Sequence, residues 1–229
     1  MARTVAIGEQ DFEEIVQKNY FYIDKTLFIK EWWESGDSVT LLTRPRRFGK
    51  TLNMSMLKKF FSIKYANRKD LFERFAIWKD EEYRKLQGTY PVISLSFAKV
   101  KDTNLKDAKK QIRGIIQSVY RAKLFLREGN TLTPEEVVYY NSILSNEADD
   151  VDMADALHRL SDYLYRYYGK KVIILLDEYD TPMQEAYVDG FWEDLVAFTG
   201  SLFNSTFKTN PWLERAIMTG ITRVSKESI

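Results

Sequence analysis

The sequence predicts an α/β fold, a three-layer sandwich in which a mostly parallel sheet is flanked by helices. Short apolar, strand-like runs at 39–42, 91–97 and 172–176 alternate with longer segments of helical periodicity. The last of these runs, VIILL, is wholly apolar, which is typical of a strand buried on both faces of a parallel sheet. With 229 residues the chain has the length of one such domain, and we expect residues 1–229 to form a single domain.

The composition is that of a soluble globular protein, with 45% hydrophobic and 29% charged residues. No apolar run approaches the roughly 20 residues needed to span a bilayer, and the N-terminus lacks the apolar region of a signal peptide. The absence of cysteine excludes disulfides and thiolate metal sites, and a cytoplasmic setting is the default expectation. A net charge of +1 gives no overall attraction to nucleic acid.

The N-terminal region predicts two helices before the first strand. A short helical stretch at 11–17 precedes the segment YFYIDKT. Asp24 has the residue type of an N-cap for a second helix at 25–34, whose aromatic and apolar residues fall at i,i+4 spacing. Gly36 fits the position that ends this helix.

Residues 38–57, SVTLLTRPRRFGKTLNMSML, have the pattern of strand, loop ending in Gly-Lys-Thr, and helix that a phosphate-binding P-loop requires. Gly49 lets the backbone approach a β-phosphate, and N–H groups at the helix N-terminus point at the anion. Lys50 would reach the β- and γ-phosphates as a catalytic cation, and the Thr51 hydroxyl would ligate Mg²⁺. The residues expected to bind the nucleotide in this segment are Arg46, Arg47, Phe48, Gly49, Lys50, Thr51 and Leu52.

The match to the usual pattern G-x-x-x-x-G-K-[ST] is incomplete, because Arg44 stands where the first glycine is expected. Pro45 follows directly and stiffens the turn. Taken alone, the Gly-Lys-Thr sequence could open a surface helix by chance.

Basic residues are concentrated between positions 44 and 69, where nine occur without an acidic residue. The first four crowd the phosphate loop, so triphosphate binding is the economical explanation for them. The others lie in the stretch 58–69 and fit either a solvated surface or a contact with nucleic acid. They are Lys58, Lys59, Lys64, Arg68 and Lys69.

Helical periodicity dominates the middle of the chain. We expect helices at 50–62, 71–86, 105–126, 134–144 and 153–168. Thr133 and Glu136 form a capping box with proline at the first helical position, and Gly169 fits the end of the last helix. The one histidine, His158, has no second His or Cys at ligand spacing, so we interpret it as a surface or interhelix residue.

The most apolar strand runs directly into carboxylates, in the sequence VIILLDEYDTP. Ligands of open α/β sheets bind beyond the carboxyl ends of the strands, where Asp177 and Glu178 lie. An apolar strand ending in Asp-Glu is the Walker B pattern, in which Asp177 would hold Mg²⁺ and Glu178 would polarise the attacking water as general base. An exposed acidic turn is the simpler alternative. Because this motif follows Gly-Lys-Thr in the right order, we predict a P-loop NTPase sandwich with a Mg²⁺–nucleotide site.

The C-terminal part predicts a helix at 190–203, a polar loop at 204–211 and a strand at 212–223 that ends in hydroxyls and an arginine. In ATPases with an extra strand between the P-loop and Walker B strands, that strand carries a polar residue near the γ-phosphate. Thr219 fits this position. Arg223 follows where a cation would reach the same phosphate, or would form an ordinary salt bridge.

Five motifs in order, YFYIDKTLFI, LLTRPRRFGKTLNMSML, YPVISLSF, VIILLDEYDTP and MTGITRVSKESI, resemble the AAA-ATPase-like domain family of predicted P-loop ATPases. Members are similar in carrying R-P-R-R-F-G-K-[ST], which accounts for Arg44. The resemblance implies that Tyr22, Asp24 and Lys25 lie near the base or ribose. Because longer members continue with helices and often a PD-(D/E)XK nuclease-like domain, it also implies the N-terminal part of a longer protein, whose lid and C-terminal domain would lie outside this sequence.

We therefore expect an ATP-binding domain with Mg²⁺-dependent ATP hydrolysis, slow in isolation, that drives or regulates an attached nuclease-like or other effector domain. Two other classes of function stay open. One is a non-hydrolysing nucleotide switch, and the other is a nucleic-acid-binding module that uses the stretch 58–69 or the C-terminal part. No membrane partner is expected, and a homo-oligomer stays open.

Overall fold

The computed structural model describes residues 4–222. Its sheet has four parallel strands in the order β1-β4-β3-β2 within these residues. The strands are β1 (Val39–Thr43), β2 (Val92–Ser96), β3 (Val172–Asp177) and β4 (Leu213–Gly220). The α/β class and the parallel sheet are confirmed, and β4 lies between β1 and β3.

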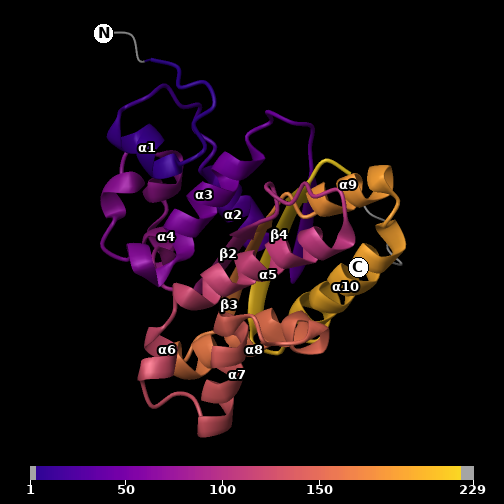
Figure 1. Cartoon of the computed structure of the whole chain (residues 1–229). Helices are drawn as coiled ribbons and strands as arrows, with labels where there is room; N and C mark the ends of the chain where they lie inside the picture. Colours follow the sequence, from indigo (N-terminus) through magenta and orange to yellow (C-terminus); the bar gives the residue numbers. More distant parts are fainter. Residues whose placement is uncertain (1–3, 223–229) are drawn as a thin grey trace.

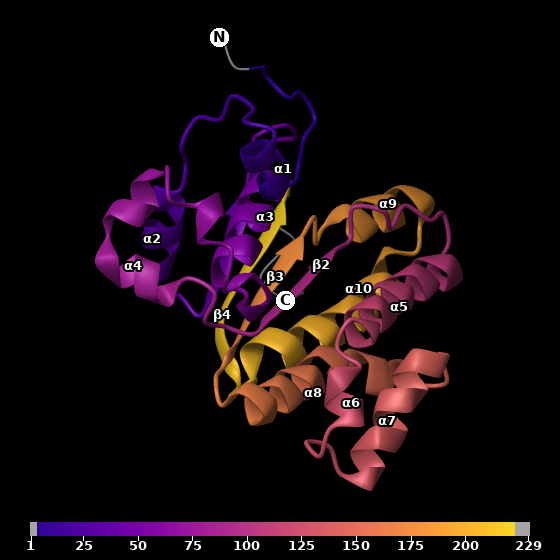
Figure 2. The ribbon, with the colours of Figure 1, turned by 90° about the vertical axis from the view of Figure 1, so that its left-hand side faces the viewer.

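Helices flank both faces of the sheet, as Figure 1 and Figure 2 show. One face carries the first four helices of the chain, which are α1 (Phe12–Gln17), α2 (Leu27–Glu34), α3 (Lys50–Phe61) and α4 (Glu81–Leu86). The other group contains α5 (Leu105–Arg121), α6 (Phe125–Glu128), α7 (Pro134–Ser145), α8 (Asp150–Tyr168), α9 (Thr181–Asp189) and α10 (Trp192–Phe203). Within residues 4–222, no helix is both long and apolar enough to cross a membrane.

Strand β3 contributes to the hydrophobic cores on both faces of the sheet, because its side chains alternate between them. Ile173 and Leu175 belong to the cluster that includes α1, α2 and α3, whereas Ile174 and Leu176 belong to the cluster that includes α5, α8 and α10. The pleat of a strand points successive side chains to opposite faces. All residues of β3 are buried, so the predicted strand buried on both faces is confirmed.

Local end signals predicted several helix boundaries. At the start of α7, the Glu136 amide donates to the Thr133 hydroxyl, and the Thr133 amide donates to the Glu136 carboxylate, which confirms the capping box. Gly36 and Gly169 have φ values of +78° and +64° at the ends of α2 and α8. Glycine adopts this left-handed conformation without a steric penalty, so both stop positions are confirmed.

The single helix predicted at 71–86 is wrong. The chain forms 3₁₀ turns at Lys69–Leu71 and Ala76–Lys79 before α4 begins at Glu81. Phe72 and Phe75 pack against the ring of Phe12 in this region. Their spacing of three residues fits a 3₁₀ turn as well as an α-helix, so periodicity could not separate the two.

Other helix boundaries in the structure differ from the predicted ones. The second helix begins at Leu27 with no side-chain cap, since Asp24 accepts from the amides of Thr26 and of Ala76, the first residue of a distant 3₁₀ turn. The helix predicted at 105–126 ends at Arg121, and α6 follows it. Three further elements were not predicted: a 3₁₀ turn at Ile63–Tyr65, α9, which begins at a threonine followed by proline, and a π-helical turn in the loop at Asn204–Lys208.

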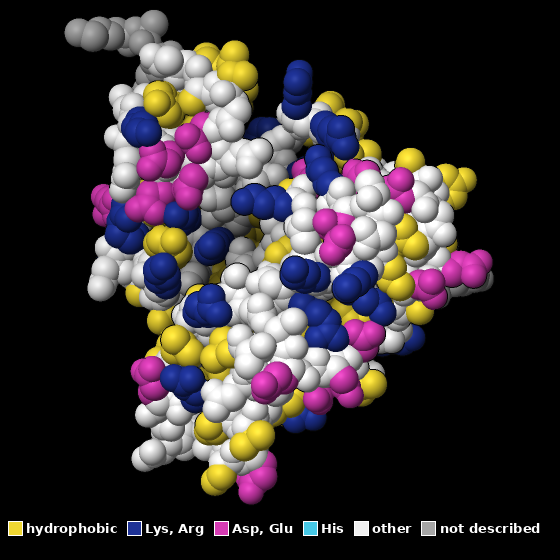
Figure 3. Space-filling view, viewed as in Figure 1, with side chains coloured by type: hydrophobic (Ala, Val, Ile, Leu, Met, Phe, Trp, Pro, Cys, Tyr) yellow, Lys and Arg dark blue, Asp and Glu magenta, His cyan; other side chains and the backbone are white. Residues whose placement is uncertain are grey.

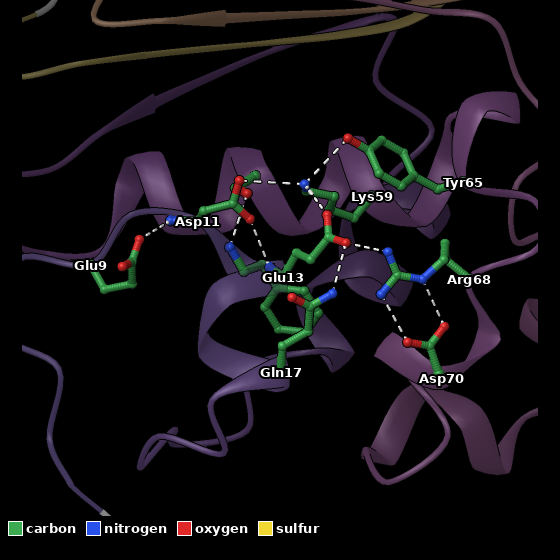
Figure 4. A network of polar contacts seen from close by, with 10 residues as sticks. Glu9, Asp11, Glu13, Gln17, Lys59, Tyr65, Arg68 and Asp70 are labelled. Carbon is green, nitrogen blue, oxygen red and sulfur yellow. Dashed lines mark hydrogen bonds and ion pairs between the residues drawn. The ribbon is translucent and has the colours of Figure 1, made fainter.

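The basic stretch 58–69 does not form one basic surface, because Lys59 and Arg68 each pair with carboxylates (Figure 4). The side chain of Lys59 is only 7% exposed and donates to Glu13 Oε2 at 2.6 Å. Arg68 pairs with the other oxygen of Glu13 and with Asp70. These contacts fasten α1 to α3, so the nucleic-acid interpretation loses two of the basic residues on which it depended.

Replacing Glu13 by glutamine should lower the free energy of unfolding. Removing one partner of a fully buried ion pair costs about 3–5 kcal/mol, and we expect about 2 kcal/mol here because Glu13 keeps some solvent contact. The hydrogen bond from Lys59 holds the pKa of Glu13 below its ordinary value of 4.5. The contribution of the Glu13 carboxylate to the free energy of unfolding is therefore complete above pH 4.5, and it falls as the pH drops below that value. Urea unfolding at neutral and acidic pH measures both effects.

Glu14→Gln is the matched control for this prediction, because it removes the same charge from the same helix. Glu14 pairs with Lys18 at the surface, and exposed pairs of this kind contribute little. Equal losses in the two variants, or a Glu13→Gln loss that persists unchanged at acidic pH, would contradict the assigned role of Glu13.

Candidate nucleotide site

The loop after β1 and the polar ends of β3 and β4 meet at the carboxyl edge of the sheet. The register pairs the last residues of β1 and β4 and sets Leu176 beside Met218, so Asp177 and Thr219 come next to each other. The Arg44 amide donates to the Gly220 carbonyl at 3.2 Å, which ties the first residue of the loop to β4. Parallel strands end at one edge, and ligands of α/β sheets bind there.

The loop between β1 and α3 has two residues in the left-handed region, Arg47 at φ +67° and Gly49 at φ +74°. Helix α3 begins at the next residue, so its N-terminal amides face the loop. The Lys50 side chain is buried, and its ammonium donates to the Arg44 and Pro45 carbonyls at 2.9 and 3.1 Å. A cation and a helix N-terminus thus converge on one turn, an arrangement suited to binding an anion.

Asp177 links the two predicted motifs directly. The Thr51 hydroxyl donates to Asp177 Oδ2 at 2.8 Å although the residues are 126 positions apart. The Thr219 hydroxyl donates to the other carboxylate oxygen. Asp177 is 5% exposed, and within residues 4–222 its side chain has these hydroxyls as partners and no basic group. A buried carboxylate is costly unless a cation or hydrogen bonds compensate its charge, so a metal ion fits this position.

Glu178 lies beside Asp177 in a strained backbone conformation. Its φ of +51° is in the left-handed region, which is uncommon for residues other than glycine. The Glu178 amide donates to the Thr219 hydroxyl at 3.2 Å, and its Oε2 accepts from the Thr181 hydroxyl at 3.2 Å. Strain of this kind persists where surrounding contacts fix it and is frequent at functional sites.

Asp180 is a residue that the sequence patterns did not single out. It is 1% exposed, and its Oδ2 accepts from the amides of Ile221 and Thr222 at 2.8 Å each. A Cβ at Gly220 would lie 2.7 Å from Asp180 Oδ1, so only glycine permits this approach. Asp180 therefore fixes the chain just after Thr219; its one sequence signal was an acidic side chain three positions after Asp177. Arg223 lies outside the described residues.

The three residues predicted near the base or ribose lie in different surroundings. Tyr22 packs edge-on against Phe12 and Phe75, and burial raises its pKa to about 12. Asp24 joins the chain before α2 to Ala76, as described above. Lys25 differs from both, because its ammonium lies 3.9 Å from the position that a Cβ on Gly49 would occupy. The structure thus brings Lys25, and neither Tyr22 nor Asp24, close to the loop.

The remaining loop residues are at the surface. Arg46, Arg47 and Phe48 are exposed, and Phe48 keeps 60% of its accessible surface. Leu52 is half-buried in the first turn of α3 and packs against the hydrophobic cluster there. Neither guanidinium forms an ion pair with any residue in the part of the chain that the structure covers, so both are available to an anion.

The profile of the family described as "Predicted AAA-ATPase" (AAA-ATPase_like) matches residues 6–229 of this chain. The chain belongs to this family. The match confirms the resemblance drawn from the sequence motifs, and family membership supports nucleotide binding at a general level.

One curated relative of this AAA-ATPase-like chain is the "Uncharacterized protein in vnfD 5'region" of Azotobacter chroococcum mcd 1. The two are 23% identical over 233 residues, which is 99% of this chain and 39% of the relative. The chain therefore spans about two-fifths of the length of this relative. No solved structure matches the chain.

No group of three or more His, Cys, Asp or Glu side chains in the described segment could hold a metal ion by itself. Magnesium bound with a nucleotide does not require such a group, because one or two carboxylates, water and phosphate oxygens complete its octahedron. In this AAA-ATPase-like domain, the hydroxyl–carboxylate pair of Thr51 and Asp177 has the oxygen donors that this mode of binding uses.

Proposed function

We propose that this AAA-ATPase-like domain binds ATP with Mg²⁺ and hydrolyses it. The observation that carries the proposal is the 2.8 Å hydrogen bond between the Thr51 hydroxyl and Asp177. In P-loop NTPases the corresponding hydroxyl and aspartate share one magnesium ion. Two residues 126 positions apart that meet in this way are hard to explain as an accidental Gly-Lys-Thr and an unrelated acidic turn.

Thr51 and Asp177 would hold the magnesium ion, since hydroxyl and carboxylate oxygens are the hard ligands that Mg²⁺ prefers. When bound, the ion would supply positive charge that stabilises the charge developing on the β- and γ-phosphates. Burial of Asp177 supports this assignment, because its carboxylate otherwise lacks a cationic partner among residues 4–222.

Lys50 would bind the β- and γ-phosphates through its ammonium. Two loop carbonyls now hold this group over the turn, and a phosphate oxygen would compete for the same protons. Lys25 would add a second cation, because its ammonium lies close to Gly49. This assignment moves Lys25 from the predicted base or ribose contact to the phosphates.

Glu178 would act as the general base. As the water oxygen attacks the γ-phosphorus, a water proton passes to the Glu178 carboxylate and the bond to the bridging oxygen of the ADP product breaks. The Thr219 hydroxyl joins Asp177 to the Glu178 amide, so it would position the base relative to the metal ligand. Arg223 stays a prediction as a further phosphate contact.

We also propose that hydrolysis drives or regulates an effector domain in a longer protein. The length of the curated relative, of which the match covers 39%, is consistent with this. A cytoplasmic setting and a homo-oligomer remain predictions.

The direct test is ADP formation by the purified chain with ATP, in the presence of Mg²⁺ and in its absence after chelation. We expect slow turnover that requires Mg²⁺. Mg²⁺-dependent binding without turnover would favour the non-hydrolysing switch. If ATP shows no Mg²⁺-dependent binding at all, the proposed function is wrong.

Replacing Arg46 and Arg47 together by alanine should weaken ATP binding by about tenfold or more, because each exposed guanidinium can donate charge-assisted hydrogen bonds to phosphate. Arg46→Lys and Arg47→Lys should also lose affinity, since lysine lacks the planar donor pair. Isothermal titration calorimetry measures the ATP affinity of the alanine double variant and of the two lysine variants. Lys106→Ala with Lys110→Ala on α5 removes the same charge from an exposed helix surface and serves as the control.

The competing hypothesis assigns these arginines to nucleic acid. It predicts that the arginine double variant keeps its ATP affinity while the salt slope of its DNA affinity falls by about two charges. That combination of results would contradict the nucleotide role.

A further inference from the structure

A cavity lies away from the nucleotide site, between α3, β2 and α5, with a volume of about 580 Å³. Its wall includes Lys58 near the end of α3 and Pro91 and Val92 at the start of β2. Asp177 instead pairs with Ser96 at the other end of β2. The cavity thus runs along the edge strand β2, and neither Asp177 nor any residue of the predicted phosphate loop lines it. Its size is that of a pocket for a small organic ligand.

Three lysines from three separate segments line this cavity: Lys58 of α3, Lys64 of the following turn, and Lys123 after α5. No acidic side chain lines it. None of the three ammonium groups forms an ion pair or hydrogen bond with another side chain or carbonyl among residues 4–222. Figure 3 shows Lys and Arg side chains gathering on the face where α3, β2 and α5 lie.

The charge of this lysine cluster is not compensated within the described protein. Lys123 is half-buried, and burial together with the neighbouring ammonium groups of Lys58 and Lys64 lowers its pKa to about 8. By contrast, burial lowers the pKa of Lys59, on the same helix as Lys58, but its partners Glu13, Tyr65 and Asp11 raise that pKa more, so the net shift is upward. Like charges held together without a counter-ion destabilise the folded protein, and a bound anion would relieve this cost.

The rest of the wall is mainly apolar. Its apolar residues include Val92, Leu95, Ile115, Val119, Phe125 and Leu164, and three serines, Ser62, Ser94 and Ser118, also line it. Pockets for organic ligands combine an apolar wall with a few polar groups that fix orientation. Inorganic phosphate alone would leave this apolar wall unused.

We propose that this cavity binds a small phosphate monoester with an apolar body, the phosphate facing Lys58, Lys64 and Lys123. A phosphate monoester carries nearly two negative charges and three acceptor oxygens, which matches a cluster of three ammonium groups better than a single carboxylate does. The proposal is independent of ATP hydrolysis, because no lysine of the cluster belongs to the nucleotide site.

The test measures binding of naphthyl phosphate by equilibrium dialysis. All chains carry Lys50→Ala, which removes the main phosphate contact proposed for the nucleotide site. We expect saturable binding that Lys58→Met/Lys64→Met/Lys123→Met weakens by at least about tenfold, since charge-assisted contacts are lost. Lys123→Met alone should weaken it measurably. Lys101→Met/Lys106→Met/Lys110→Met removes the same charge from exposed positions outside the cavity and should change affinity less than about twofold.

Naphthol and inorganic phosphate separate the two halves of the expected ligand, and each should bind at least about tenfold more weakly than naphthyl phosphate. Circular dichroism establishes that the variants are folded. Equal affinity for naphthol, unchanged affinity in the folded Lys123→Met and triple cavity variants, or equal losses in the control variant would overturn the proposal. A short dephosphorylated oligonucleotide that binds more tightly than naphthyl phosphate, with the same lysine dependence, would overturn it in favour of nucleic acid. None of these outcomes bears on ATP hydrolysis.

Discussion

Replacing Lys50 by alanine should abolish ATP binding at concentrations where the unmodified chain is saturated. The Lys50 ammonium is buried over the loop and lies at the N-terminus of α3, where a triphosphate would dock. Charge-assisted contacts to phosphate contribute about 1.5–3 kcal/mol each, and the ammonium can donate more than one. The expected loss of affinity is therefore at least about a hundredfold. Calorimetric titration with Mg²⁺–ATP measures it.

A loss of stability has to be separated from this loss of binding, because Lys50 also bridges the Arg44 and Pro45 carbonyls. Thermal unfolding without nucleotide provides that comparison. Lys69→Ala is the charge-matched control, since Lys69 is exposed and lies outside the loop. A Lys50→Ala affinity within about threefold of the unmodified chain, a difference well under 1 kcal/mol, would remove the basis for the P-loop assignment.

Replacing Glu178 by glutamine should slow ATP turnover by about a hundredfold or more while ATP still binds. Glutamine keeps the shape of the side chain and an oxygen that can accept from the Thr181 hydroxyl, but it cannot take a proton from water. General-base catalysis typically increases the rate by about 10²–10⁴-fold, so the turnover rate of Glu178→Gln should fall by at least about a hundredfold. Single-turnover ADP formation together with a binding titration separates the two effects.

Asp177→Asn supplies the contrasting result. It should weaken the dependence of ATP binding on Mg²⁺, because an amide oxygen is a poorer magnesium ligand than a carboxylate. Glu193→Gln on α10 is the control for Glu178, since Glu193 is exposed and lies outside the site. Turnover at the unmodified rate in Glu178→Gln would show that this carboxylate is not the base.

Local patterns in the sequence were sufficient for most elements of the fold. The run Val172–Leu176 predicted a fully buried strand because no polar side chain interrupts it, and the capping box of Thr133 and Glu136 predicted the start of α7 because all its bonds are local. The failure at 71–86 has a physical reason. An apolar spacing of three residues is shared by α and 3₁₀ turns, and packing around Phe12 decides between them.

The sequence by itself determined the positions of Gly-Lys-Thr and Asp-Glu, each after an apolar strand, because these motifs depend on neighbouring residues. Only the tertiary structure decided that Thr51 of α3 and Asp177 of β3 are hydrogen-bonded across 126 positions, with β4 between β1 and β3. It also decided which lysines stay uncompensated: Lys59 turns toward Glu13, whereas Lys58 meets Lys123 at a cavity. Adjacent residues on a helix point in different directions, so their partners come from whichever distant segments pack against each face, and the sequence pattern around them does not record that choice.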